Sequence, residues 1–103
     1  MAVTVILKLK LKPEFVDAIQ ADFSQNLPDT RAYEGCLALS AYRNSDDPSE
    51  IVEIERWASR EHYEKYVAWR METGMGEHLI SMLAEPPEIR YYDEFWSDEE
   101  LRS

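Results

Sequence analysis

Aromatic and ionisable side chains gather in residues 55–74, which read ERWASREHYEKYVAWRMETG. The stretch holds two of the three tryptophans, two of the six tyrosines and one of the two histidines. Tyrosine hydroxyls and indole N–H groups orient a molecule that stacks against their rings, because each side chain is apolar at one end and polar at the other. The composition indicates a pocket for an aromatic molecule, with ordinary helix packing as the simpler interpretation.

One helical stripe connects most of these residues. Tyr63, Tyr66, Val67, Arg70 and Met71 follow steps of three, one, three and one, which places them on a single helix face. Such stripes usually form part of a core. Two phenol hydroxyls brought inward nevertheless need polar partners, because an unpaired buried hydroxyl costs about 1–3 kcal/mol.

Arg70 occupies a position of this stripe where an apolar residue is expected. A guanidinium there reaches water, pairs with a carboxylate or faces a polar cavity. Glu53 and Glu55 alternate with Trp57 on one side of a predicted strand and are suitable partners for a structural salt bridge. The functional alternative is that Arg70 stabilises a phenolate or a developing oxyanion in a dry site. Both interpretations stay open on the sequence alone.

Motifs for metal and nucleotide cofactors are missing from the sequence. His62 and His78 have neither the spacing of zinc ligands nor the pattern of a two-histidine, one-carboxylate iron site. No G-x-G-x-x-G follows a strand, which argues against a flavin or nicotinamide site. We expect no metal and no organic cofactor, a solvated His62, and His78 at the mouth of a cavity.

Hydrophobic periodicity predicts the elements that position these residues. Period-two alternation predicts strands at residues 3–11, 36–43, 51–57 and 88–96. Steps of three and four predict a helix that starts at Pro13 and ends or bends at Pro28, and a second from residue 60 to about 73 that resumes at 77–85. The order β-α-β-β-α-β predicts an α+β, ferredoxin-like domain, with an antiparallel four-stranded sheet and both helices on one face.

The sheet face without helices carries apolar residues in any arrangement of the strands, among them Ile6, Val52 and Ile54. A domain of 103 residues has a modest core, and a second copy of the same sheet would cover these side chains. We predict a homodimer. The domain is expected to span residues 1–96, followed by an acidic tail at 97–103.

The charge balance limits the classes of partner. With 21 acidic and 11 basic side chains the formal net charge is -10, which repels phosphate backbones and anionic lipid headgroups. We expect neither a nucleic acid nor a membrane partner. A single cysteine, and an N-terminus whose lysines interrupt its apolar run, favour a cytoplasmic protein.

Four passages together resemble the antibiotic biosynthesis monooxygenase family of the dimeric α+β barrel superfamily. They are LKPE at 11–14, TRAYEGC at 30–36, DDPSEIVEIERWASREHYEKY at 46–66 and LAEPPEIRYYDEF at 83–95. The resemblance runs from Val3 to about Phe95 and implies a ferredoxin-like fold that pairs into a dimeric α+β barrel. It also implies oxidation of a phenolic, quinol-like or polyketide aromatic by molecular oxygen, as some members achieve without metal or flavin.

The resemblance assigns roles to particular residues. Trp57 and Tyr63 match residues that line the substrate cavity, whereas a cavity asparagine of some members is replaced by Glu53. In the mechanism that we expect, Glu53 or a tyrosinate accepts the substrate proton, and Arg70 and Trp57 stabilise the anion. The residues expected to bind the substrate are Tyr63, Tyr66, Trp69 and His78.

Three other functions are considered for this scaffold. Haem-degrading relatives use a first-strand asparagine and a helix histidine, and this chain has no such asparagine and has Tyr66 or Val67 near the histidine position, which argues against haem. A non-catalytic dimer that binds a small aromatic or a quinone remains an alternative. So does an isomerase or cyclase that needs no oxygen.

Overall fold

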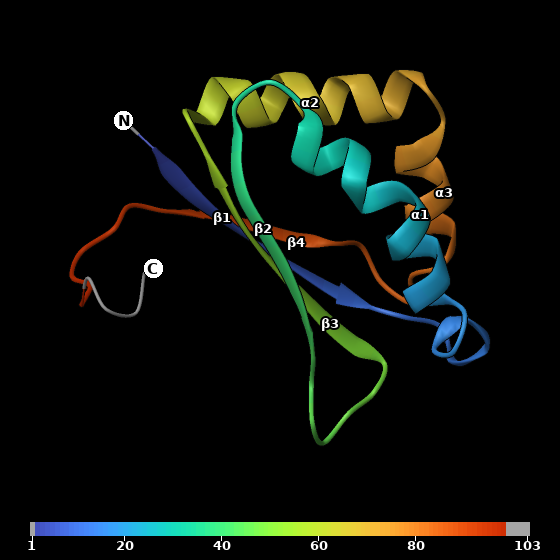
Figure 1. Cartoon of the computed structure of the whole chain (residues 1–103). Coiled ribbons are helices and arrows are strands. Elements are labelled where there is room, and N and C mark those ends of the chain that lie inside the picture. The colour runs from blue at the N-terminus through green and yellow to red at the C-terminus, as the bar shows by residue number, and fades with distance from the viewer. Residues whose placement is uncertain (1, 99–103) are drawn as a thin grey trace.

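Four strands and three α-helices are arranged in the order that the periodicity predicts (Figure 1). The computed structural model describes residues 2–98. The elements are β1 (Val3–Lys10), a short 3-10 helix (Pro13–Phe15), α1 (Ile19–Ala32), β2 (Cys36–Arg43), β3 (Glu50–Trp57), α2 (Arg60–Glu72), α3 (Met75–Ser81) and β4 (Glu88–Tyr92). The strands pair antiparallel in the order β2-β3-β1-β4, with the helices on one side, which confirms the α+β, ferredoxin-like prediction.

Alternation along the central strands separates the two faces of the sheet. On β1 the side chains of Val3, Val5, Leu7 and Leu9 are buried beneath the helices, and the residues between them face the other way. The register pairs Leu7 with Glu53 and Val5 with Glu55, so β3 presents its odd-numbered residues to the helices. The helix side therefore carries acidic groups inside an otherwise apolar layer.

The helices differ from the prediction mainly at the ends of α1. This helix begins at Ile19 instead of Pro13, because the first turn is a separate 3-10 helix, and it continues through Pro28 to Ala32. Thr30, beyond the proline, is almost fully buried, so tertiary contacts hold the last turn. At the start of α2, the Ser59 side chain accepts a hydrogen bond from the His62 N–H, as expected of an N-cap.

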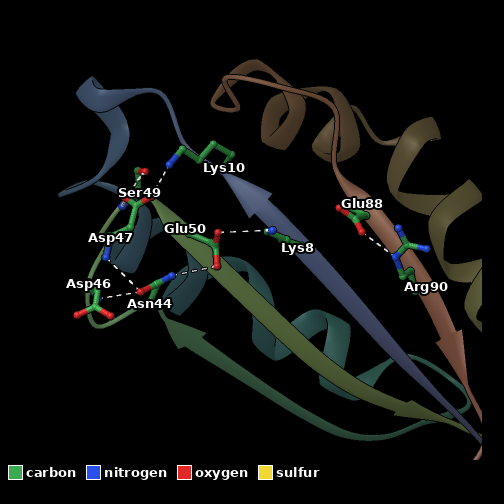
Figure 2. Close-up of polar contacts among 9 residues, drawn as sticks. All are labelled: Lys8, Lys10, Asn44, Asp46, Asp47, Ser49, Glu50, Glu88 and Arg90. Carbon is green, nitrogen blue, oxygen red and sulfur yellow. Dashed lines mark hydrogen bonds and ion pairs between the residues drawn. The ribbon is translucent and has the colours of Figure 1, made fainter.

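The open face of the sheet has an apolar middle and a charged end. Ile6 pairs with Ile54, and Val52 with Tyr42, across neighbouring strands, and Ile54 and Tyr42 are exposed. At the charged end, Figure 2 shows Lys8 beside Glu50, Lys10 beside Asp47, and Arg90 beside Glu88. The open face thus carries exposed apolar side chains, as predicted.

The β2–β3 connection is a polar turn ordered by its own side chains (Figure 2). Asn44 Oδ1 accepts hydrogen bonds from the N–H groups of Asp46 and Asp47, and Asp47 Oδ1 accepts from the N–H and hydroxyl of Ser49. Because Asn and Asp side chains bond to nearby backbone in this way, they favour tight connections.

The last strand is shorter than predicted. It ends at Tyr92, where pairing with β1 ends, and Phe95 and Trp96 lie exposed beyond it. Most of the tail predicted at 97–103 lies outside the described residues. Within residues 2–98, no helix has the length and apolar character that crossing a membrane requires.

Candidate active site

A cavity of about 190 Å³ lies between the sheet and the three helices. Its apolar lining includes Leu7, Phe23, Leu27, Val67, Leu79 and Ile89, and its polar lining includes Asp22, Asn26, Thr30, Glu53, Glu55, Tyr63, Tyr66, Arg70 and His78. Five of the seven predicted site residues line this cavity, and the two tryptophans, Trp57 and Trp69, do not. A larger, more open groove between α1 and β2 is lined by none of the seven.

Strand β3 supplies two buried acids to the cavity wall. Glu53 and Glu55 are only 4% and 2% exposed, and they alternate with Trp57 on the face beneath the helices. A hydrogen bond joins the two carboxyl groups. Burial, followed by the charge of Glu55 and the hydrogen bond to it, raises the pKa of Glu53 well above its ordinary value, against an opposing effect of Arg70. Glu53 therefore binds its proton more tightly than an ordinary glutamate does.

Trp57 holds the second acid in place. Its Nε1–H donates to Glu55 Oε1 at 2.8 Å, so the indole N–H that we expected to orient a substrate is already occupied. The indole is fully buried and packs against Tyr63 and Tyr66, with ring centroids 5.5 and 5.0 Å away. Trp57 therefore does not line the cavity itself, but it contacts Glu55 and two tyrosine rings that do.

Arg70 is anchored to α1 and not to a carboxylate. Its Nη2 donates to the Asn26 carbonyl at 2.8 Å and to Thr30 Oγ1 at 2.9 Å, and its Nε donates to the Tyr66 hydroxyl at 2.9 Å. Among residues 2–98 no salt bridge joins it to Glu53 or Glu55, so the structural ion pair considered from the sequence is not formed. Nη1 donates to no described residue, and the side chain lines the cavity.

The two tyrosines on α2 have different environments. The Tyr66 hydroxyl lies 2.6 Å from Thr30 Oγ1 and accepts the Arg70 bond, whereas the Tyr63 hydroxyl bonds to no described residue. Tyr63 is only 3% exposed and lines the cavity. Burial raises the pKa of both tyrosines, which argues against the tyrosinate base considered from the sequence.

Trp69 lies beside the site, outside the cavity wall. Its ring is 5.1 Å from that of Tyr33, and the Arg70 guanidinium lies 4.7 Å from the Trp69 ring centroid. This stacking orients Arg70 and gives Trp69 an indirect connection to the cavity.

His78 lies where the cavity meets solvent. Its Nε2 is 2.6 Å from Asp22 Oδ1, so it joins α3 to α1, and its side chain is 47% exposed. The prediction placed it at the cavity mouth, which agrees with its position in the lining.

Three contributors were missed in the sequence, and a fourth, Glu55, was considered only as a salt-bridge partner of Arg70. Asp22, Asn26 and Thr30 come from α1, and no pattern in the sequence pairs this helix with Arg70 or His78. Glu55 had a visible signal, because it alternates with Glu53 and Trp57 on a strand face that a helix must cover. Among the described residues, no group of three or more His, Cys, Asp or Glu side chains is arranged to hold a metal ion.

Comparison with known proteins places this geometry in context. The family model described as antibiotic biosynthesis monooxygenase matches residues 2–70. No curated protein matches the sequence.

Several solved structures share the fold. A conserved protein from Methanosarcina mazei superposes with a TM-score of 0.81 at 21% identity, covering 92% of this chain and 94% of that one. Rv0793 from Mycobacterium tuberculosis gives 0.80 at 22% identity, covering 94% and 98%. A variant of SnoaB, a cofactor-independent oxygenase from Streptomyces nogalater, gives 0.79 at 12% identity, covering 93% and 95%.

Proposed function

Because the chain belongs to the antibiotic biosynthesis monooxygenase family, we propose that it oxidises a small phenol or quinol with molecular oxygen inside the cavity beneath α2. No metal or flavin takes part in the proposed reaction, as in the similar fold of the cofactor-independent oxygenase from Streptomyces nogalater. The observation that carries the proposal is a ring-sized cavity of about 190 Å³ that Glu53, Tyr63 and Arg70 line together.

The volume supports a substrate with one ring. An apolar cavity of about 150 Å³ holds a benzene molecule, and the cavity here measures about 190 Å³. A monocyclic phenol with one or two small substituents fits that space. A fused polyketide does not fit the cavity of one protomer, so we expect affinity to fall as rings are added.

Two unoccupied donors suit a phenol oxygen. Arg70 Nη1 and the Tyr63 hydroxyl line the cavity and bond to no described residue. A fixed guanidinium in a site that excludes water stabilises a phenolate more than the neutral phenol, which favours ionisation of the substrate. The phenolate is the electron-rich form that reacts with oxygen.

The overall reaction balances without a further reductant. A ring C–H group becomes C=O, so the phenol becomes a quinone. One atom of O₂ enters the product, and the other leaves as water with the two hydrogens lost by the substrate. Arg70 and Tyr63 hold the substrate oxygen in this scheme, and His78 and Tyr66 border the ring.

The same proposal includes a homodimer. Ile6, Val52, Ile54 and Tyr42 on the open sheet face support pairing with a second copy, which would remove these side chains from water. A cytoplasmic location also remains part of the proposal.

Oxygen consumption tests the reaction. The purified, metal-stripped protein should consume oxygen above the autoxidation rate with monocyclic phenols or hydroquinones, and less with naphthols. Arg70→Ala should abolish the uptake, while Lys65→Ala, an exposed change on the same helix, should leave it unaltered. An uptake rate equal to autoxidation across the panel would refute the proposed reaction.

The buried acid pair favours one other function. Paired carboxyl groups suit acid–base rearrangement, so an isomerase or cyclase would keep its turnover in the absence of oxygen. Binding of the same phenols without any turnover would instead assign the chain to the non-catalytic, ligand-binding alternative.

A further inference from the structure

We propose that Glu53 and Glu55 form a two-carboxyl proton relay, in which Glu53 passes the proton of a bound phenol to Glu55. The inference rests on the proposed function, because it requires a phenol in the same cavity. It assigns Glu55 a role that the sequence did not suggest, and it changes the role of Glu53 from base to carrier.

The geometry of β3 supports the relay. Residues two apart on a strand point to the same face, so Glu53 and Glu55 are neighbours in the cavity wall, both more than nine-tenths buried. A hydrogen bond connects their carboxyl groups, and the Trp57 indole fixes the far acid by donating to Glu55 Oε1. The two acids and the indole form a continuous row.

A separate observation indicates that a polar ligand enters beside this row. Tyr63 is only 3% exposed and lines the same cavity, and its hydroxyl bonds to no described residue, so this hydroxyl stays accessible from the cavity. A hydroxyl that is accessible from the cavity and bonded to no described side chain can donate to a ligand oxygen. A phenol oxygen bound there would lie in the cavity that the acid pair also lines.

Glu53 is poorly suited to act alone as a base, because burial and the neighbouring Glu55 raise its pKa well above the ordinary value. Two adjacent carboxyl groups resist holding two negative charges, so the pair shares one proton. A neutral carboxylic acid has one O–H donor and one C=O acceptor. It can therefore accept a proton on one oxygen while it releases another.

The transfer balances as follows. The phenol O–H bond breaks and an O–H bond forms on the carbonyl oxygen of Glu53, while the Glu53 O–H bond breaks and an O–H bond forms on Glu55. The products are a phenolate and two neutral carboxylic acids. When oxygen is reduced in the later steps, the proton returns by the same route to the oxygen atom that leaves as water.

The charges around the pair favour this exchange. One negative charge occupies the buried space before and after the step, so no additional charge must be desolvated. Arg70 on α2 lines the same cavity and stabilises the phenolate that appears. Tyr63 and Tyr66 on α2 and Cys36 on β2 interact electrostatically with Glu55, and Tyr91 on β4 packs against Tyr63. Asp22 and His78 are the titratable groups at the cavity mouth.

Anaerobic binding of 4-nitrophenol tests the relay without turnover, since the absorbance of this probe reports its ionisation. In the wild-type protein the pKa of the bound probe should be at least about one unit lower than that of the free probe, which is a tenfold change in its ionisation constant. The pair should retain the proton, so the binding heat should not depend on the ionisation enthalpy of the buffer.

Isosteric variants locate the acceptor. Glu55→Gln and Glu53→Gln should each abolish the shift, and Trp57→Phe, which loses the bond to Glu55 and part of the buried ring, should reduce it. Glu72→Gln changes the net charge equally at an exposed position on α2 and should keep the full shift. Should Glu55→Gln fail to fold, Glu53→Gln still tests the relay, because its amide can donate to Glu55.

Other outcomes contradict the relay. Release of one proton per bound probe to the buffer, or an unchanged shift in both glutamine variants, would overturn it even if the protein consumes oxygen. A full shift without oxygen uptake would support the relay and refute the oxygenase function. A cavity that does not bind the probe would overturn both.

Discussion

Strand β3 carries glutamates on both faces of the sheet, and the two faces give them opposite properties. Glu50 faces the open side, where Lys8 Nζ lies 3.7 Å from its carboxylate (Figure 2). Glu53 and Glu55 face the helices, lie in the cavity wall and pair with each other. One residue type on one strand thus forms surface ion pairs on one side and an acid pair on the other.

The pKa directions express the same difference. On the open face, a hydrogen bond from Lys10 lowers the pKa of Asp47 to about 2, and one from Arg90 lowers the pKa of Glu88. In the cavity, burial raises the pKa of Glu53. Exposed pairs keep their charge and contribute little to stability, whereas a buried acid without a cationic partner binds its proton more tightly and becomes available for chemistry.

The largest expected effect concerns what covers the open face. Ile54→Arg places a cation in the middle of the apolar patch. In a symmetric dimer this arginine would face the same arginine of the second protomer. Juxtaposed like charges cost several kcal/mol, so the dimer dissociation constant should rise by at least about a hundredfold. Light scattering during size-exclusion chromatography measures this change. Gln25→Arg, which adds the same charge on α1, should leave the mass unaltered, and a monomeric wild-type protein would refute the predicted dimer.

The next effect separates the two roles of Arg70. Arg70→Ala should lower kcat by about a hundredfold or more, since single oxyanion donors contribute that much. It should also reduce the free energy of unfolding, because three hydrogen bonds to α1 and Tyr66 are lost. Thr30→Val keeps the guanidinium and removes only the hydroxyl that bonds to Arg70 and Tyr66, so it should lower stability by about 1 kcal/mol and lower kcat much less than Arg70→Ala does. Equal losses of kcat and stability in both variants would assign Arg70 to structure alone.

Most of the fold was predictable because it depends on patterns within single segments. Alternation of apolar and polar residues predicted the four strands, and the polar connection at 44–50 predicted the β2–β3 hairpin. Both predictions agree with the observed sheet. The start of α1 was placed too early, and the sequence did not decide whether the helix ends at Pro28 or continues through it. Thr30 explains that passage, because its contacts with Tyr66 and Arg70 come from a helix 36 and 40 residues away.

The site was predictable only as a list of residues. The stripe on α2 and the alternating acids of β3 identified side chains that line the cavity, but not their partners. The sequence left Arg70 a choice between water, a carboxylate and a polar cavity, and in the structure Arg70 lines the cavity but is held by α1, a partner that the sequence did not indicate. Such partners depend on contacts between helices and strands that are far apart in the sequence. The hydrophobic periodicity of a single sequence does not reveal these contacts.

A smaller effect tests the buried acid directly. Glu53 binds its proton more tightly in the folded than in the unfolded state, so wild-type stability should fall as pH rises above about 4.5, towards the raised folded pKa. Glu53→Gln lacks this titration and should gain relative stability over that window, by up to about 1.4 kcal/mol per pH unit. Urea unfolding at a series of pH values measures the difference, and a difference independent of pH would contradict the raised pKa.

The same substitution on the open face should give the smallest effect, with the opposite sign. Arg90 lowers the folded pKa of Glu88, so this carboxylate stabilises the protein above its unfolded pKa of about 4.5, and the contribution is lost as pH falls through the lower folded value. Glu88→Gln should therefore be slightly less stable than wild type at neutral pH and equal to it in acid. Because both partners are exposed, high salt should remove the difference at neutral pH while leaving the Glu53→Gln effect in place. Salt sensitivity of both variants would show that the two faces of the sheet do not hold their acids in different environments.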